Sequence, residues 1–313
     1  NQTLDPKQRQ FLADIGDSTQ NAYYPSASID TFSASKILYR KIDTLVNGVL
    51  RDSIYVYSTN ASDTLYSLAF SDVGVGKGDY LTDESNAANG KIFRWVAPDI
   101  NNNKQGQYEP KILLIAPRKQ QLISLGAEYA LSANSTISTE LAMSNFDVNT
   151  FSSRNKSDNT GFAARLLLNN TRQIKNSSKG LQFQTNLGYE WVQSAFKPIE
   201  RLRAVEFNRE WGLPLNAGPA TENILKAGVQ LRDRTGFNLQ YQLSSYVRSD
   251  HYNGLRNSIL HSAIIKGWRI NDQINITNIN QQTQKGYYLK PSLDISRAFP
   301  KIGNYTLGGT YSL

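Results

Sequence analysis

Apolar and polar side chains alternate regularly between Gln121 and the C-terminus. In the clearest stretch, residues 181–191, one side carries Leu, Phe, Thr, Leu, Tyr and Trp, and the other carries Gln, Gln, Asn, Gly and Glu. Successive side chains of a strand point to opposite faces, so this pattern predicts strands with one apolar and one wet face. The stretches run for about ten residues, which matches a tilted membrane strand better than the five or six residues typical of soluble sheets.

The alternation recurs along the rest of this region, and the connections between its stretches differ in length. The further alternating stretches are 123–131, 137–143, 162–168, 225–231, 237–243, 274–276, 287–295 and 305–313. Short polar turns are expected at 132–135, 233–236, 271–272 and 302–304, and long connections at 144–160, 196–222 and 248–256. Short turns on one side and long loops on the other are typical of outer-membrane barrels.

Hydropathy leaves two kinds of fold open for such a chain. No apolar run approaches the roughly 18 residues of a membrane helix, and the mean hydropathy is −0.47. A polar, strand-rich chain of this kind is either a soluble β fold or a closed barrel whose strands alternate lipid-facing and lumen-facing residues.

Charge and residue counts exclude several functions. The 34 Lys and Arg against 26 Asp and Glu are scattered rather than clustered, so nucleic-acid binding is not expected. With no Cys and only two histidines, His251 and His261, the chain has no thiol chemistry and too little material for a zinc site or a Ser/His/Asp triad. We therefore expect a non-catalytic protein without cofactor or metal.

A glycine-rich run at 74–78 invites a phosphate-binding interpretation. It lacks the Gly-Lys-Ser/Thr of a Walker loop, and the Asp-Tyr-Leu-Thr-Asp that follows does not predict the required helix. The run instead predicts a tight irregular β turn in which glycines supply positive φ angles.

These patterns divide the chain into three parts. Residues 1–50 are expected to be extended and partly helical, with Pro6 in the first helical position behind an Asp5 cap. Residues 51–120 form a small glycine-punctuated β module, and 121–313 form antiparallel barrel strands. The chain lacks an initiating Met and stops within an alternating stretch, so we expect a fragment whose remaining strands lie downstream.

Two groups of side chains are candidates for function. In a barrel, the wet face of 181–191 would line the lumen through Gln182, Gln184, Asn186 and Glu190. The densest charged segment, 196–211, could form a lid or plug held by an ion-pair network, and a plain solvated loop is the alternative. The members of that network would be Glu200, Arg201, Arg203, Glu206, Arg209 and Glu210.

Three short patterns carry a resemblance to a known group. They are Phe-x-x-Val-Gly-x-Gly-x-Gly-Asp-Tyr at 70–80, Gly-x-Tyr-x-Pro at 106–110, and Glu-Arg-x-Arg-x-Val-Glu-Phe-x-Arg-Glu-Trp at 200–211. They resemble segments of large outer-membrane proteins of Bacteroidota, among them the translocon barrel of the type IX secretion system. The resemblance implies a Gram-negative outer-membrane location and a larger barrel, but it does not transfer the secretion activity.

The sequence therefore predicts an all-β fold, an antiparallel transmembrane β-barrel segment preceded by the glycine-punctuated module. The expected function is transport, secretion or surface assembly, with outer-membrane lipid and other outer-membrane or periplasmic proteins as partners. The alternative is a soluble cell-surface β-sandwich that binds glycan or protein, in which the same alternation separates a dry core from a wet exterior.

Overall fold

The computed structural model describes residues 2–84, 90–174, 178–281, 284–299 and 303–310. The chain forms two compact units. Unit 1 comprises Asn1–Arg118 and Val148–Asn155, and unit 2 comprises Lys119–Asp147 and Lys156–Leu313. Residues 1–50 and 51–118, which the sequence patterns separate, thus lie in one unit.

Unit 1 combines one α-helix with short strands in three small antiparallel sheets. The sheet orders are β1-β10, β2-β5-β3-β4 and β6-β9-β7-β8. The elements are α1 (Pro6–Ile15), a 3-10 helix η1 (Thr19–Asn21), β1 (Tyr23–Pro25), β2 (Ser28–Ile29), β3 (Tyr39–Val46), β4 (Val49–Tyr57), β5 (Leu65–Ser67), β6 (Ser71–Asp72), β7 (Tyr80–Asp83), β8 (Ile92–Trp95), β9 (Tyr108–Glu109) and β10 (Lys111–Leu113).

The predicted N-terminal helix is confirmed, together with its cap. Asp5 accepts a hydrogen bond from the backbone of Gln8, and the Gln8 side chain accepts one from the Asp5 backbone. At the other end, the Asn149 side chain donates to the carbonyls of Leu12 and Gly16, both at 2.7 Å. Both ends of the helix therefore have partners for backbone groups that the helix itself leaves free.

The glycine-rich turn brings two of the sequence patterns together. Gly74 and Gly76 have φ angles of +98° and +72°, which confirms the predicted turn. Gly78 serves a different purpose, because it forms a β-bridge with Gly106. A Cβ atom on Gly78 would lie 2.5 Å from the backbone of Tyr108, so only glycine allows this close approach.

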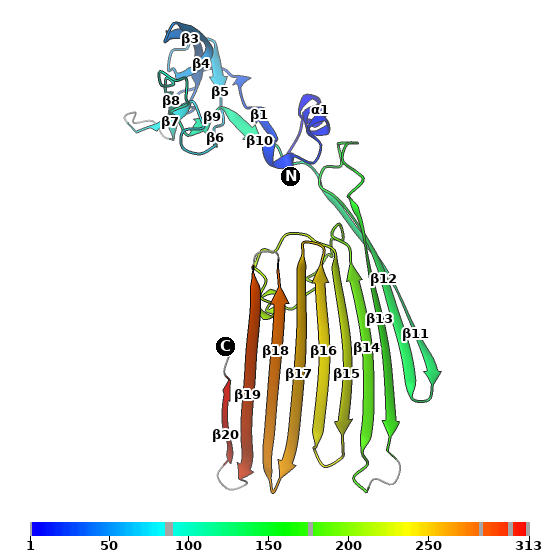
Figure 1. Ribbon diagram of the computed structural model, residues 1–313. Helices are drawn as coiled ribbons and strands as arrows, with labels where there is room; N and C mark the ends of the chain where they lie inside the picture. Colours follow the sequence, from blue (N-terminus) through cyan, green and yellow to red (C-terminus); the bar gives the residue numbers. More distant parts are fainter. Residues whose placement is uncertain (1, 85–89, 175–177, 282–283, 300–302, 311–313) are drawn as a thin grey trace. The chain divides into compact units, whose positions relative to one another are not determined.

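Unit 2 is a single antiparallel sheet in which each strand pairs with the next along the chain (Figure 1). Its elements are β11 (Lys119–Ser132), β12 (Ser135–Asp147), β13 (Thr160–Gln173), β14 (Gln182–Val192), α2 (Phe207–Glu210), β15 (Glu222–Arg232), β16 (Asn238–Arg248), β17 (Tyr252–Ile265), β18 (Trp268–Asn280), β19 (Lys285–Phe299) and β20 (Gly303–Thr310). Among the described residues the sheet is open, with β11 and β20 as its edges. The chain is thus mostly β, and a closed barrel is not part of the described fold.

Two of the predicted connections are wrong. The long loop expected at 248–256 is a tight turn, since β16 ends at Arg248 and β17 begins at Tyr252. In this turn the Arg248 guanidinium hydrogen-bonds Asp250 at 2.7 Å, and His251 has a φ of +68°. Charged residues next to a histidine indicated a loop, but their interactions close a hairpin.

The short turn expected at 271–272 lies inside β18, and the chain reverses instead at Lys266 and Gly267, both with positive φ angles. Asn271 and Asp272 are tolerated in a strand because their side chains have cross-strand partners. Asp272 lies 2.8 Å from His261 Nδ1, and Asn271 donates to Asp294 at 3.4 Å. The turns at 132–135 and 233–236 are confirmed, while the one at 302–304 begins outside the described residues.

Candidate functional site

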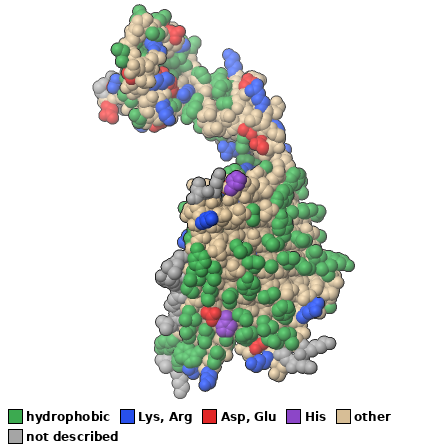
Figure 2. Space-filling model, viewed as in Figure 1, with side chains coloured by type: hydrophobic (Ala, Val, Ile, Leu, Met, Phe, Trp, Pro, Cys, Tyr) green, Lys and Arg blue, Asp and Glu red, His purple; other side chains and the backbone are tan. Residues whose placement is uncertain are grey.

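The strand register collects the apolar side chains of unit 2 on one face of the sheet. Leu187 lies opposite Leu168 on one neighbouring strand and Ala227 on the other. Many large side chains of this face are exposed, by between 36% (Met143) and 71% (Leu125). Figure 2 shows hydrophobic side chains gathered over the strands of unit 2. The exposed members of this apolar face include Ile123, Leu125, Tyr129, Leu141, Met143, Phe162, Leu166, Phe183, Leu187, Tyr189, Leu225, Val229, Leu239, Tyr241, Val247, Leu255, Ile259, Ile265, Trp268, Ile274, Tyr287 and Leu293.

The opposite face, here called the polar face, carries mainly amide, hydroxyl and charged side chains. The four candidates of β14, Gln182, Gln184, Asn186 and Glu190, all lie on it. Gln184 lies opposite Gln230, and Gln182 accepts a hydrogen bond from Arg232 at 3.0 Å. Asn186 lies opposite Gly228, where an added Cβ would come within 2.7 Å of its amide.

The connection between β14 and β15, residues 193–221, folds onto this polar face through an aromatic anchor. Trp211, at the end of α2, is 3% exposed and packs with Tyr246, Tyr252 and Ile279. The Tyr252 hydroxyl donates to the Trp211 carbonyl at 2.6 Å. Gly254 makes room for the indole, since a Cβ there would lie 2.8 Å from the ring. The connection is therefore packed against the sheet rather than solvated along its whole length.

Tyr246 is the aromatic side chain that β16 contributes to this anchor. In the structure it lies on the polar face and is fully buried, with its ring centroid 5.3 Å from that of Trp211. Its position in the alternation of β16 assigns it to the wet side, and the anchor of segment 193–221 explains why an aromatic residue occurs there.

A group of ion pairs fastens the same connection to strand ends. Arg203 pairs with Glu190 of β14 and, at 2.7 Å, with Glu222 of β15. Arg248 extends the group, because its guanidinium lies 3.3 Å from Glu222 and 2.7 Å from Asp250. Burial tends to lower the pKa of Arg203, but the two carboxylates outweigh burial and raise that pKa above its ordinary value.

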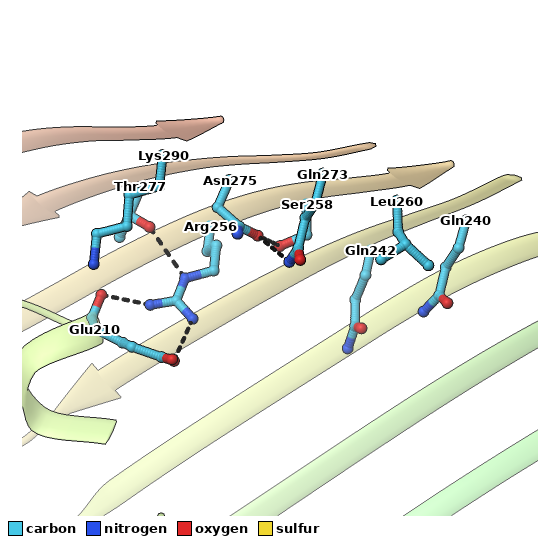
Figure 3. Close-up of a pocket in the computed structure, with 10 residues that line it drawn as sticks. All are labelled: Glu210, Gln240, Gln242, Arg256, Ser258, Leu260, Gln273, Asn275, Thr277 and Lys290. Carbon is cyan, nitrogen blue, oxygen red and sulfur yellow. Dashed lines mark hydrogen bonds and ion pairs between the residues drawn. The ribbon is translucent and has the colours of Figure 1, made fainter. Parts of the chain in front are cut away.

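A second attachment joins α2 to β17. The Arg256 guanidinium donates to the Glu210 carboxylate at 3.1 Å and to Thr277 at 3.0 Å (Figure 3). It also lies over the Trp211 ring, 4.4 Å from the centroid. Arg256 thus combines an ion pair with a cation–π contact at one place.

The charged candidates of 196–211 divide into three kinds. Arg203 and Glu210 pair with residues of the strands, whereas Glu206 and Arg209 pair with each other at 2.7 Å on the exposed side of α2. Glu200 and Arg201 are exposed and line a cavity of about 460 Å³ over β11 to β14. The sequence did not indicate their partners Glu222, Arg248 and Arg256, because all three lie in stretches that it predicted as long connections, 196–222 and 248–256.

Neither a metal site, nor a membrane-spanning helix, nor a similar known protein adds a further site among the described residues. Within the described ranges, no group of three or more His, Asp or Glu side chains could hold a metal ion. None of the helices that the structure describes has the length and hydrophobicity of a membrane-spanning helix. Comparison with protein-family models, with curated proteins and with solved structures gives no match.

Proposed function

We propose that unit 2 is a segment of a transmembrane β-barrel of a Gram-negative outer membrane, acting without catalysis in transport, secretion or surface assembly. In this proposal the apolar face meets the acyl chains of outer-membrane lipid. The polar face lines the lumen, and segment 193–221 is a plug held inside it. Other outer-membrane or periplasmic proteins are the expected partners.

One observation carries the proposal: a ten-stranded sheet presents an extended, mainly apolar face on one side and a mainly polar face on the other. The largest exposed apolar patch of a soluble monomer is about 300–600 Å². Large apolar side chains exposed on every strand from β11 to β19 form a far more extensive surface. Hydrocarbon chains of lipid remove such a surface from water without any protein cover.

The alternative, a soluble cell-surface β-sandwich that binds glycan or protein, requires a second sheet over the apolar face. Within unit 2 the described residues supply no such sheet. The aromatic anchor and the ion pairs of segment 193–221 lie on the other face, so they leave the apolar side uncovered. These positions favour the barrel.

The barrel proposal has its own structural requirement. Unpaired strand edges are not tolerated in the hydrocarbon region of a membrane. In the proposed assembly β11 and β20 must therefore have pairing partners, either in further strands or in other copies of unit 2.

Fractionation of a Gram-negative host that expresses the chain with an export signal tests the proposal. We expect the protein in the outer-membrane fraction, extractable only with detergent, and with a gel mobility that changes on heating. A protein that stays soluble without detergent and shows no heat-dependent mobility would favour the sandwich.

A further inference from the structure

We propose that the polar face contains a binding site for an acidic saccharide, a short sugar with at least one carboxylate or sulfate group. The site is a pocket of about 270 Å³ between α2 and strands β16 to β19 (Figure 3). Small-molecule sites typically measure about 300–1,000 Å³, so this pocket fits a ligand of one or two sugar rings.

Amide and hydroxyl groups form one end of the pocket. Asn275 accepts hydrogen bonds from Ser258 at 2.7 Å and from Gln273 at 3.3 Å, which fixes the orientation of its amide. The side-chain amides of Gln240 and Gln242 on β16 have no hydrogen-bond partner among the described residues. Each of their amides offers both donors and an acceptor, and sugar hydroxyls need both.

Charged groups gather at the opposite end. In Figure 3, Lys290 lies on the side of the pocket where Glu210 and Arg256 lie, away from Gln240. Glu210 and Arg256 neutralise each other. Lys290 makes no ion pair with a described residue, so this end has one unmatched positive charge. An anionic substituent of the ligand would supply the missing charge.

The lining favours a saccharide over a peptide or an apolar solute. Leu260 is the only apolar residue among the lining residues, so there is no pocket for a hydrophobic side chain. A ligand that lacks hydroxyl groups would leave Gln240 and Gln242 without partners, which lowers affinity. The combination of free amides with one free ammonium group matches a sugar acid.

Two substitutions test the charged end and the amide end of the pocket independently. The full chain is purified in detergent, and binding of digalacturonic acid and of its neutral counterpart digalactose is measured by calorimetry. Lys290→Gln should lower the affinity for digalacturonic acid by about tenfold and leave the affinity for digalactose unchanged. Gln242→Met keeps the side-chain size but removes the hydrogen bonds, so it should lower the affinity for both sugars. Lys226→Gln removes a lysine from the same face outside the pocket, and it should change neither affinity.

The inference rests on the proposed function, because a lumen is what would present this face to solutes. The two fail in different ways. A protein with heat-dependent mobility in the outer membrane that binds neither sugar overturns the saccharide site alone. The saccharide site would also be overturned if sulfate bound as tightly as digalacturonic acid. An equal loss of affinity for digalacturonic acid in Lys290→Gln and Lys226→Gln would overturn it too.

Discussion

At the scale of single residues, Arg203 is the side chain through which the two groups of candidates meet. It belongs to the charged segment 196–211 and pairs with Glu190 of β14. It joins Glu190, a candidate for the polar face, to Glu222 at the start of β15. All three side chains are at most one quarter exposed, so each carboxylate depends on the guanidinium for neutralisation. The position of segment 193–221 should therefore be sensitive to this one arginine.

Substitution of Arg203 by Ala should release this segment from the strand ends. Hydrogen bonds to charged partners contribute about 2 kcal/mol, so we expect roughly thirtyfold faster amide hydrogen exchange in residues 193–221. Arg201→Ala is the matched control, because Arg201 is exposed and has no ion pair among the described residues. Equal protection in the two variants would contradict the role of Arg203 as a fastener.

Tyr39 of unit 1 predicts a dependence on alkaline pH. The side chain is 1% exposed and accepts a hydrogen bond from the Phe93 backbone at 3.0 Å. Burial raises its pKa from 10.0 to about 12. The folded state thus holds the proton more tightly than the unfolded state. This contribution is fully present below pH 10 and is lost as the pH rises toward 12.

The free energy of unfolding of unit 1 should fall by roughly 1.4 kcal/mol per pH unit above pH 10 on account of Tyr39. In Tyr39→Phe this part of the slope should disappear. Urea unfolding followed by the fluorescence of Trp95, with the other tryptophans replaced by Phe, measures it. The same slope with and without the tyrosine hydroxyl would refute the assignment.

At the scale of elements, β14 shows how register turns a local pattern into two faces. Its pairing places Leu187 beside Leu168 and Ala227, and Gln184 beside Thr171 and Gln230. A shift by one residue would exchange the two sets, because side chains alternate with a period of two. Each strand therefore keeps its apolar residues in line with those of its neighbours only in the observed register.

Charge placed on the two faces of β14 should have opposite consequences. Leu187→Arg puts a guanidinium against hydrocarbon at a cost of about 2–4 kcal/mol, so membrane assembly should fail or slow strongly. Gln184→Arg adds the same charge to the polar face and should assemble normally. The fraction with heat-dependent mobility after refolding into lipid vesicles measures both variants, and equal assembly would contradict the assigned faces.

At the scale of the whole molecule, the proposal divides the tryptophans by environment. Trp268 belongs to the apolar face and is 40% exposed, whereas Trp211 is buried on the polar face. In vesicles of lipids brominated along the acyl chains, a variant with only Trp268 should lose most of its fluorescence. A variant with only Trp211 should keep its fluorescence. Quenching of neither tryptophan would show that the apolar face does not meet lipid.

Local sequence determined much of this architecture. Alternation predicted nearly all of the long strands, and the division of β14 into two faces follows from the same period. The cap at Asp5 and the positive φ angles of Gly74 and Gly76 were also readable, because each depends on residues within a few positions.

Only the tertiary structure decided what contacts what. Strand β17 and the continuity of β18 escaped prediction, because cross-strand partners such as His261 for Asp272 outweigh the local tendency of polar residues to form turns. The bridge between Gly78 and Gly106, the anchor at Trp211 and the pairing of Arg203 with Glu222 join residues distant in sequence. Such partners are selected by the approach of folded elements in space, and no short-range pattern encodes them.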